Sequence, residues 1–271
     1  MRRLGPTLVA LAAGGLAWGW FEAGWVRLRE RRLGVPGLPA ELDGLRIAHV
    51  SDFHLGVPSR GTHAVRRAVA WVEQRQPELT CLTGDLLTRP GGEPLLRELV
   101  ARLPRCFAVL GNHDFGTATD PFVLGSPVAE LEPATLLADE TRTLELRGRR
   151  VQVAGLDPRT ARRGGDPPEP DRDADLRILL SHFPWTLDRL EPGDWHVVLA
   201  GHMHAGQIVV PYGRGRLHLA HPSAHYTHGV YRRHGTTMHV SPGLGTTFVP
   251  FRYFARPEAT ELRLEAEGAR S

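Results

Sequence analysis

The sequence predicts an α/β fold with two β-sheets. Apolar runs of strand length alternate with helical patterns between residues 45 and 114, and further short apolar runs continue to residue 267. Such alternation is typical of a parallel sheet covered by helices. Many of the apolar runs also end in Asp, Asn or His. Open α/β sheets bind their ligands at the carboxyl ends of strands, so these side chains are candidates for a functional site.

The first 40 residues are predicted to be a hydrophobic anchor and linker, which leaves residues 41–271 as the main folded domain. Residues 4–26 are mostly apolar, and a membrane helix needs about 20 such residues. The run is rich in glycine and carries Glu22. It could therefore be a marginal transmembrane anchor, an uncleaved signal-like segment or a helix docked on the domain itself.

Arginines on both sides of this segment bear on its location. Arg2 and Arg3 precede it, and four arginines follow it, at Arg27, Arg29, Arg31 and Arg32. The second group favours association with the inner membrane and a catalytic domain on the cytoplasmic face. Arg2 and Arg3 could instead begin a twin-arginine export signal, which would place the domain outside.

The remaining elements follow from hydrophobic periodicity. Strands are expected over 46–52, 79–85 and 106–114, with helices over 64–74 and 94–103 between them. A hairpin over 144–156 and a surface loop over 162–175 precede two further strands, over 176–182 and 195–204. The segments 207–211, 238–243 and 261–267 are predicted strands of the second sheet.

Composition argues against a nucleic-acid partner. The net charge is +3, and the basic residues are all arginines, scattered among Asp and Glu. A nucleic-acid-binding protein usually gathers its basic residues on one element. The two cysteines, Cys81 and Cys106, lie within apolar runs and are predicted to be buried free thiols.

Five strand ends carry potential metal ligands. The residues are Asp52, His54, Asp85, Asn112, His182, His202 and His204, with His113 beside them. Carboxylate, imidazole and amide ligands suit Mn²⁺, Fe²⁺, Zn²⁺ or Ni²⁺. Two such ions roughly 3.5–4 Å apart would clamp a phosphate and activate a bridging water. A carboxylate can bridge both ions, and Asp85 is the natural candidate.

Taken together, these motifs identify a family. The set SDFH (51–54), GD (84–85), GNHD (111–114), SH (181–182) and GHMH (201–204) resembles the calcineurin-like metallophosphoesterase superfamily. The resemblance implies a two-sheet sandwich flanked by helices, and two divalent ions, most often Mn²⁺. It also implies hydrolysis of a phosphodiester or pyrophosphate by a metal-bridging hydroxide.

The resemblance assigns a role to each site residue. Asp52, His54 and His204 would hold the first ion, Asp85 would bridge, and Asn112, His182 and His202 would hold the second. His113 would donate a proton to the leaving group or stabilise the phosphate. Asp114 would orient His113 from behind.

One branch of the superfamily is a closer match. Residues 39–56, 200–211 and 240–258 resemble bacterial membrane-associated phosphodiesterases, a branch that includes enzymes acting on UDP-2,3-diacylglucosamine in lipid A synthesis. This implies a phosphodiester or lipid-linked pyrophosphate substrate and a membrane surface as partners. Thr88, Met203 and Ala205 depart from the usual pattern, which puts substrate preference in doubt rather than metal binding.

Several alternatives remain open. The chain could be a phosphomonoesterase or a phosphodiesterase of another substrate, or a scaffold that binds metal without catalysis. Intact ligands and an intact His113 argue against the scaffold. Arg252 and Arg256 could bind a second phosphate of the substrate or could be structural.

Overall fold

The computed structural model describes residues 4–125, 128–213, 215–220 and 222–267. Two mixed sheets of six strands each form a sandwich, as predicted. The first sheet has the order β1 (Arg27–Pro36), β14 (Glu258–Glu267), β2 (Arg46–Val50), β3 (Leu79–Thr83), β4 (Cys106–Val109), β5 (Thr135–Leu136). The second has the order β12 (Gly229–Arg233), β13 (Thr236–Val240), β9 (Val197–Ala200), β8 (Leu176–Ser181), β7 (Arg149–Leu156), β6 (Glu140–Leu146).

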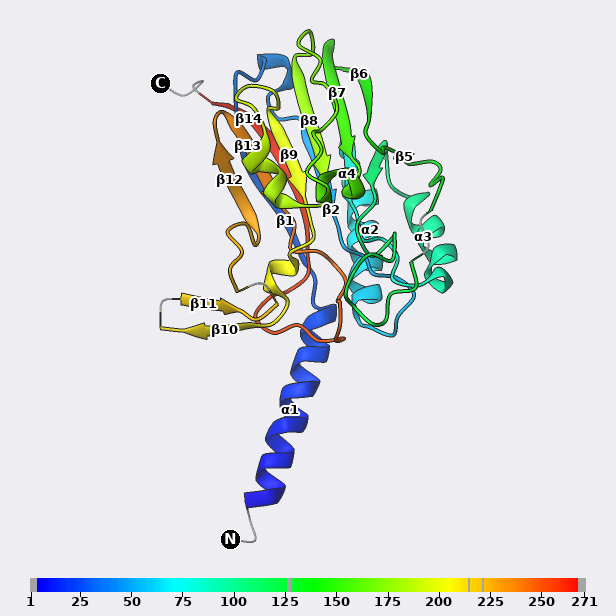
Figure 1. The fold of residues 1–271 in the computed structure, drawn as a ribbon, viewed down its shortest axis with the longest axis vertical. Coiled ribbons are helices and arrows are strands. Elements are labelled where there is room, and N and C mark those ends of the chain that lie inside the picture. Colours follow the sequence, from blue (N-terminus) through cyan, green and yellow to red (C-terminus); the bar gives the residue numbers. More distant parts are fainter. Residues whose placement is uncertain (1–3, 126–127, 214, 221, 268–271) are drawn as a thin grey trace.

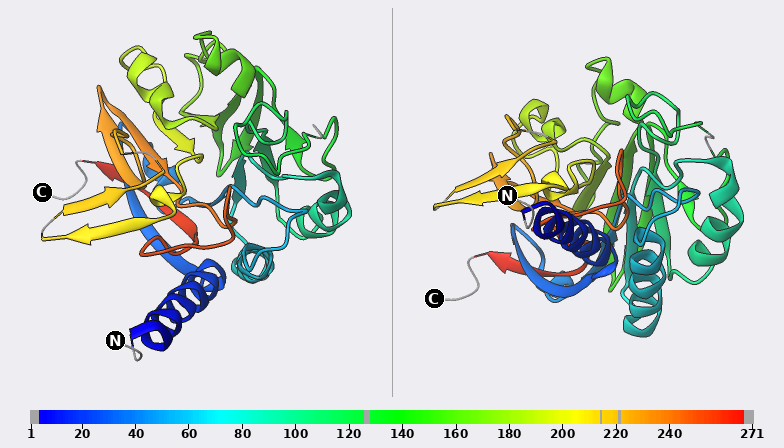
Figure 2. Two further views of the ribbon diagram at one scale, coloured as in Figure 1. Left: turned by 60° about the horizontal axis from the view of Figure 1, so that its bottom comes forward. Right: turned by 90° about the horizontal axis from the view of Figure 1, so that it is seen from below.

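The predicted βαβαβ unit is confirmed. Strands β2, β3 and β4 pair in parallel and are joined by α2 (Gly61–Arg75) and by η2 (Pro90–Gly92) with α3 (Glu93–Val100). Helix α2 buries Ala64, Ala68 and Val72, which lie one turn apart along a single face. Figure 2 shows α2 and α3 together on one side of the molecule, away from the second sheet.

The space between the sheets is an apolar core. Ile47 and Cys81 of the first sheet and Val153, Ile178 and Val197 of the second are fully buried there. Both cysteines are buried and free, as predicted. Smaller elements cover the ends and the outer face, namely η1 (Ala40–Leu42), α4 (Pro158–Arg162), η3 (Pro184–Arg189) and η4 (His204–Gly206).

Sheet membership differs from the prediction at two places. The C-terminal strand β14 belongs to the first sheet, because it pairs with β1 on one side and β2 on the other. Among the described residues, the sheet partner of strand β10 (Val209–Tyr212) is β11 (Gly215–His218), in a separate hairpin. Of the three predicted strands of the second sheet, only the one at 238–243 lies there, as β13.

Part of the segment that was predicted to be a linker, residues 27–36, lies in the first sheet. Strand β1 is paired with β14 along its whole length, from Arg27 with Glu258 to Pro36 with Glu267. Residues 27–36 are therefore a strand of the catalytic domain. Extension of the sheet by a strand buries Leu33 and Val35, which explains why this segment is not a free linker.

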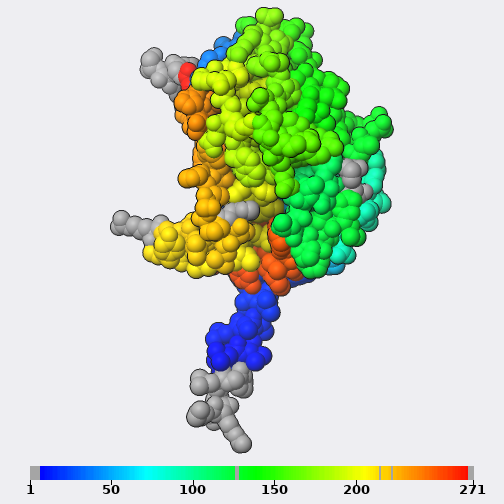
Figure 3. All heavy atoms as spheres, viewed as in Figure 1, coloured from blue at the N-terminus to red at the C-terminus, as the bar shows by residue number. Residues whose placement is uncertain are grey.

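Helix α1 (Leu4–Gly24) stands out from the body of the domain (Figures 1 and 3). Its exposed side chains include Leu8, Val9 and Leu11 towards the free end and Trp18 and Trp20 nearer the domain. Within the part of the chain that the structure describes, no helix meets the length and hydropathy needed to cross a bilayer. The arginines at positions 2 and 3 lie outside the described residues.

Buried Glu22 fastens α1 to the domain. Its carboxylate accepts hydrogen bonds from the Ala255 amide at 2.8 Å and from the Trp18 indole at 3.0 Å. Arg252 donates its amide N–H to the Gly19 carbonyl, and the Tyr253 hydroxyl donates to the Gly15 carbonyl. The one acidic residue of the helix therefore forms part of its attachment to residues 252–255.

Candidate metal centre

The predicted ligands meet at one end of the sandwich. Asp52 and His54 follow β2, Asp85 follows β3, Asn112 and His113 follow β4, His182 follows β8, and His202 and His204 follow β9. Parallel strands of both sheets end here, on the side of the molecule from which α1 projects (Figure 1). The topology therefore brings together residues that are far apart in the sequence.

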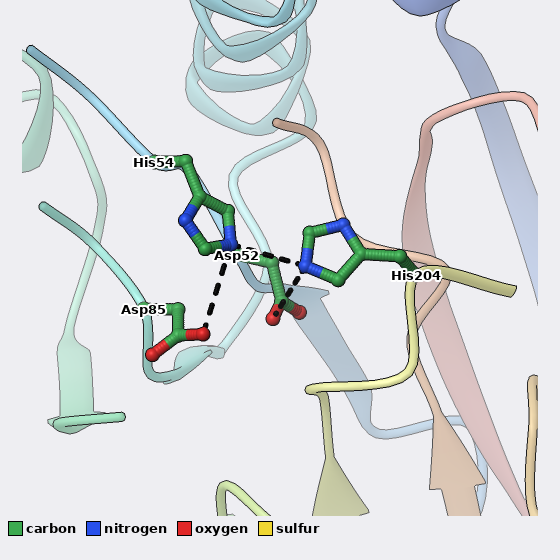
Figure 4. Close-up of side chains that lie close together, drawn as sticks. All are labelled: Asp52, His54, Asp85 and His204. Atoms are coloured by element: carbon green, nitrogen blue, oxygen red, sulfur yellow. Dashed lines mark hydrogen bonds and ion pairs between the residues drawn. The ribbon is translucent and has the colours of Figure 1, made fainter. Parts of the chain in front are cut away.

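One group comprises Asp52, His54, Asp85 and His204, all buried, whose ligand atoms lie within 4.8 Å of one another. Their side chains point towards a common centre (Figure 4). His54 Nε2 is 3.0 Å from His204 Nε2 and 3.7 Å from Asp85 Oδ2. His204 Nε2 is 3.4 Å from Asp52 Oδ1. Imidazole nitrogens and carboxylate oxygens that converge in this way fit a divalent cation.

The second group comprises Asp85, His182 and His202. His182 Nε2 lies 3.4 Å from Asp85 Oδ2, 3.1 Å from His202 Nδ1 and 3.0 Å from Asn112 Oδ1. Asp85 belongs to both groups, and the same oxygen faces His54 on one side and His182 on the other. This position suits the bridging role that we predicted for it.

The backbone around the ligands is strained. Asp52, His54, Asp85, His202 and His204 all have positive φ angles, between 48° and 71°. Residues with side chains rarely adopt this left-handed region, and such strain concentrates at functional sites. The surrounding fold holds five of the predicted ligands in this conformation.

Glycines let the ligand loops approach one another closely. A Cβ atom at Gly111 would collide with Asp85 Oδ1, and one at Gly201 would lie 2.7 Å from Asp52 Oδ2. Both glycines belong to the sequence motifs, in GNHD and GHMH. Glycine is needed at both positions because a side chain would not fit there, and not because of any chemistry of its own.

Hydrogen bonds orient the predicted ligands, and nearby charges set their protonation states. His182 Nδ1 donates to the Thr83 carbonyl at 2.8 Å, which leaves Nε2 facing the cluster. Burial alone would raise the pKa of Asp85, but His182 and His113 outweigh it and hold that pKa well below its usual range. Burial also opposes protonation of His182, yet the carboxylates of Asp85 and Asp52 raise its pKa to about 9. Asp85 is therefore a carboxylate, as a bridging ligand must be.

Thr88 has a definite role despite its departure from the family pattern. Its hydroxyl lies 3.1 Å from His54 Nδ1. With Nδ1–H donating to this oxygen, His54 presents Nε2 to the other ligands. Thr88 thus orients a predicted ligand.

His113 lies beside the ligands, but Asp114 does not orient it as predicted. Both Asp114 oxygens accept backbone N–H groups, from Gly111, Leu86 and Leu87. Asp114 therefore ties the two ligand loops together and stays away from His113, whose Nδ1 has no hydrogen-bond partner among the described residues. Backbone amides left unpaired in these loops attract the carboxylate more strongly than the ring does.

On its other side, His113 Nε2 lies 3.9 Å from Asp85 Oδ2 and close to Thr247, which in turn contacts Asp120. Thr247 Oγ1 lies 3.4 Å from Nε2 and donates to Asp120 Oδ2 at 2.8 Å. Burial lowers the pKa of His113, although Asp85 opposes the shift. Asp120 and Thr247 were missed in the sequence because they lie in loops without strand or helix periodicity. Thr247 ends a glycine-rich turn at 241–247, which lies within the stretch 240–258 that resembles the membrane-associated branch.

Arg252 is structural and does not reach a substrate phosphate. It is fully buried and donates to the carbonyls of Gly245, Pro242, Ala255 and His204. Its terminal nitrogen also lies 3.2 Å from His204 Nδ1, so Arg252 supports a predicted ligand from behind. Arg256 stacks on the Trp25 ring at the base of α1.

A cleft of about 310 Å³ opens over the ligands. Asp85, Asn112, His113, His202 and His204 line its floor. Residues that the sequence did not single out complete the walls, namely Thr117, Ala118, Thr119, Arg162, Phe183, Trp185, Thr247 and Phe248. The cleft gives a phosphate access to both ligand groups and to His113.

Comparison with known proteins agrees with this site. The profile of the calcineurin-like phosphoesterase family matches residues 45–206. The chain is 28% identical to the uncharacterized metallophosphoesterase YkuE of Bacillus subtilis, over 95% of this chain and 94% of that protein. It is 26% identical to the phosphodiesterase YaeI of Escherichia coli, over 90% of each chain.

A third relative is the UDP-2,3-diacylglucosamine pyrophosphatase LpxG of Chlamydia trachomatis. It is 26% identical, over 74% of this chain and 77% of that protein. The family profile covers more than half of the chain and contains every predicted metal ligand. The chain therefore belongs to the calcineurin-like phosphoesterase family and is a metal-dependent phosphoric ester hydrolase.

Proposed function

We propose that the chain hydrolyses a phosphodiester or pyrophosphate bond in a membrane-associated substrate such as UDP-2,3-diacylglucosamine. Two cavities beside the cleft favour a diester over a monoester as the substrate. The cleft shares Thr247 and Phe248 with one of these cavities and Trp185 with the other. A substrate with a group on each side of the scissile phosphorus can use both, whereas a monoester uses at most one.

The residues divide the work as follows. Asp52, His54, Asp85 and His204 would hold one divalent ion, and Asp85, Asn112, His182 and His202 the other. Bound ions would neutralise the phosphate and activate a water molecule as the nucleophile. His113, which lines the cleft, would donate a proton or hydrogen bond from Nε2 to the leaving oxygen, and Thr247 positions the ring.

The membrane part of the proposal rests on α1. Leu8, Val9 and Leu11 are exposed at 64–70%, and Trp18 and Trp20 lie closer to the domain. Aliphatic side chains beyond a belt of tryptophans suit the acyl and headgroup layers of a bilayer. The arginines of β1 favour the inner membrane and its cytoplasmic face.

Hydrolysis of four substrates tests the proposal. The purified protein, treated with chelator and reloaded with Mn²⁺, Fe²⁺, Zn²⁺ or Ni²⁺, should cleave UDP-2,3-diacylglucosamine faster than bis(p-nitrophenyl) phosphate. It should cleave both faster than p-nitrophenyl phosphate and leave single-stranded DNA intact. Asp85→Asn should abolish turnover, because the bridging charge is lost. Faster cleavage of the monoester would overturn the proposal, and cleavage of the generic diester alone would discard the lipid nucleotide.

Sedimentation with anionic vesicles tests the membrane part separately. The full-length protein should pellet with the vesicles, and a variant that begins at Arg27 should stay in the supernatant while it still cleaves bis(p-nitrophenyl) phosphate. Equal sedimentation of both forms would exclude α1 as the contact with the membrane.

A further inference from the structure

A second cavity adjoins the catalytic cleft. Its volume is about 280 Å³, slightly below the roughly 300–1,000 Å³ typical of a whole small-ligand site. It is therefore suited to one arm of a substrate rather than to a complete one. Its apolar wall consists of Val57, Pro58, Phe122, Phe248, Val249 and Pro250.

Two polar residues of this cavity, Asp120 and Arg89, make hydrogen bonds within the protein. Asp120 accepts hydrogen bonds from Thr247 and from the Phe248 and Phe122 amides. Arg89 donates its Nε–H to the Phe122 carbonyl, and its guanidinium lies 6.0 Å from the Phe122 ring. An apolar occupant avoids the cost of displacing these bonds.

Phe248 separates the two spaces. It lines both the cavity and the catalytic cleft, as does Thr247, which contacts His113. The φ angle of Phe248 is +58°, an unusual conformation for an aromatic residue, and its amide is fixed by a 2.7 Å hydrogen bond to Asp120. The strained loop thus holds an exposed aromatic side chain at the junction of the cavity with the cleft.

The cavity also lies on the side of the molecule that carries α1. Phe251, next to Pro250 of the wall, packs against Trp20 with ring centroids 6.4 Å apart. Pro58, another residue of the wall, is followed closely by Arg60, whose guanidinium lies 5.9 Å from the Phe21 ring. Two segments that line the cavity therefore continue along the chain to residues that contact α1, at the lower end of the molecule in Figures 1 and 3.

We propose that this cavity binds an alkyl or acyl chain carried by one of the two groups esterified to the scissile phosphate. Three observations support this assignment: the apolar wall, the shared boundary with the catalytic cleft, and the continuity with the base of α1. The inference rests on the proposed diesterase activity and names the part of the substrate that this side of the site recognises. The phosphate would lie over the metal ligands while the chain passes Phe248 into the cavity.

A homologous series of p-nitrophenyl n-alkyl phosphates, from methyl to decyl, tests the assignment below the micellar concentration. Each methylene that enters the cavity should raise kcat/KM by up to about fourfold, until the cavity is full. Val249→Trp, which fills the cavity, should flatten this dependence on chain length. Val230→Trp is the matched control, because Val230 is 39% exposed like Val249 but lies on β12. In this variant kcat/KM should depend on chain length as it does in the wild type.

Calorimetry with n-alkylphosphonates, which are not hydrolysed, gives a second readout on the metal-loaded protein. Affinity should rise with chain length and the heat capacity change should become more negative, and both trends should weaken in Val249→Trp. A rate independent of chain length, or equal trends in Val249→Trp and the wild type, would overturn the assignment while the diesterase activity stands. Chain-length-dependent binding without hydrolysis of any diester would instead refute the proposed function and keep the apolar site.

Discussion

Replacement of Arg252 by methionine tests how the glycine-rich turn is held against the metal site. The side chain is fully buried, and four backbone carbonyls accept its hydrogen bonds, those of His204, Pro242, Gly245 and Ala255. A methionine of similar length fills the space but donates nothing. The carbonyls of Pro242, Gly245 and Ala255 would then be buried without a partner, whereas the His204 carbonyl keeps its hydrogen bond from the Gln207 amide.

The magnitude follows from these contacts. A buried acceptor that loses its partner costs about 1–3 kcal/mol, and the lower figure for three acceptors gives about 3 kcal/mol. Release of the buried guanidinium offsets part of this loss, because burial already disfavours the charge and lowers its pKa to about 10. We therefore expect the free energy of unfolding to fall by about 2–3 kcal/mol.

Urea unfolding in the presence of a chelator measures this loss without a contribution from bound metal. Arg252→Lys should lose less, because an ammonium group retains three donors. Arg142→Met is the matched control: its side chain is 53% exposed and pairs with Glu140 at the surface, so a change of at most about 0.5 kcal/mol is expected. A loss below about 1 kcal/mol for Arg252→Met would show that these carbonyls do not depend on the guanidinium.

Three further predictions concern catalysis, the helix and pH. His113→Ala should reduce kcat by about 10²–10⁴-fold, while elemental analysis should show the same metal content as in the wild type. Loss of the metals would refute the proposed division of roles. Glu22→Ala should leave the Ala255 amide unpaired and speed hydrogen exchange of residues 15–24, and exchange equal to that of a Glu140→Ala control would show that Glu22 does not fasten the helix. Burial lowers the pKa of His49 to about 3 and that of His196 to about 4. The unfolded chain, with an ordinary histidine pKa of about 6.5, binds more protons in this range, so stability should fall as pH drops from about 6.5 towards 4. Urea midpoints should show this fall, and a smaller one in His196→Gln; an unchanged midpoint would contradict the assignment.

The fold and the clustered residues could be predicted from the sequence wherever a local sequence pattern determines the structure. Periodicity located β2, β3, β4, α2 and α3, and the parallel topology then required residues after those strands to meet at one edge. Each motif also combines a ligand with the glycine that lets a neighbouring loop approach it, as at Gly111 and Asp85. Such combinations are visible in a sequence without coordinates.

Non-local pairing and loop contacts were beyond the reach of the sequence. An alternating apolar pattern shows that 261–267 is a strand but does not say which sheet it joins, and pairing with β1 decides this. Arg252 resembles a substrate-binding arginine by type, yet the carbonyls that surround it are backbone groups without a sequence signature. For the same reason Asp114 was predicted to contact His113, whereas the backbone amides of Gly111, Leu86 and Leu87 bind it.

The position of β1 has a consequence for how the protein is made. Within the described residues its only sheet partner is β14, at the opposite end of the chain. On a ribosome, β2, β3 and β4 can pair while synthesis continues, but β1 must wait until β14 has emerged. Contacts between such distant segments are slow to form. During this interval α1 is tied to a strand without a partner, so the final pairing both completes the sheet and sets the helix against residues 252–255.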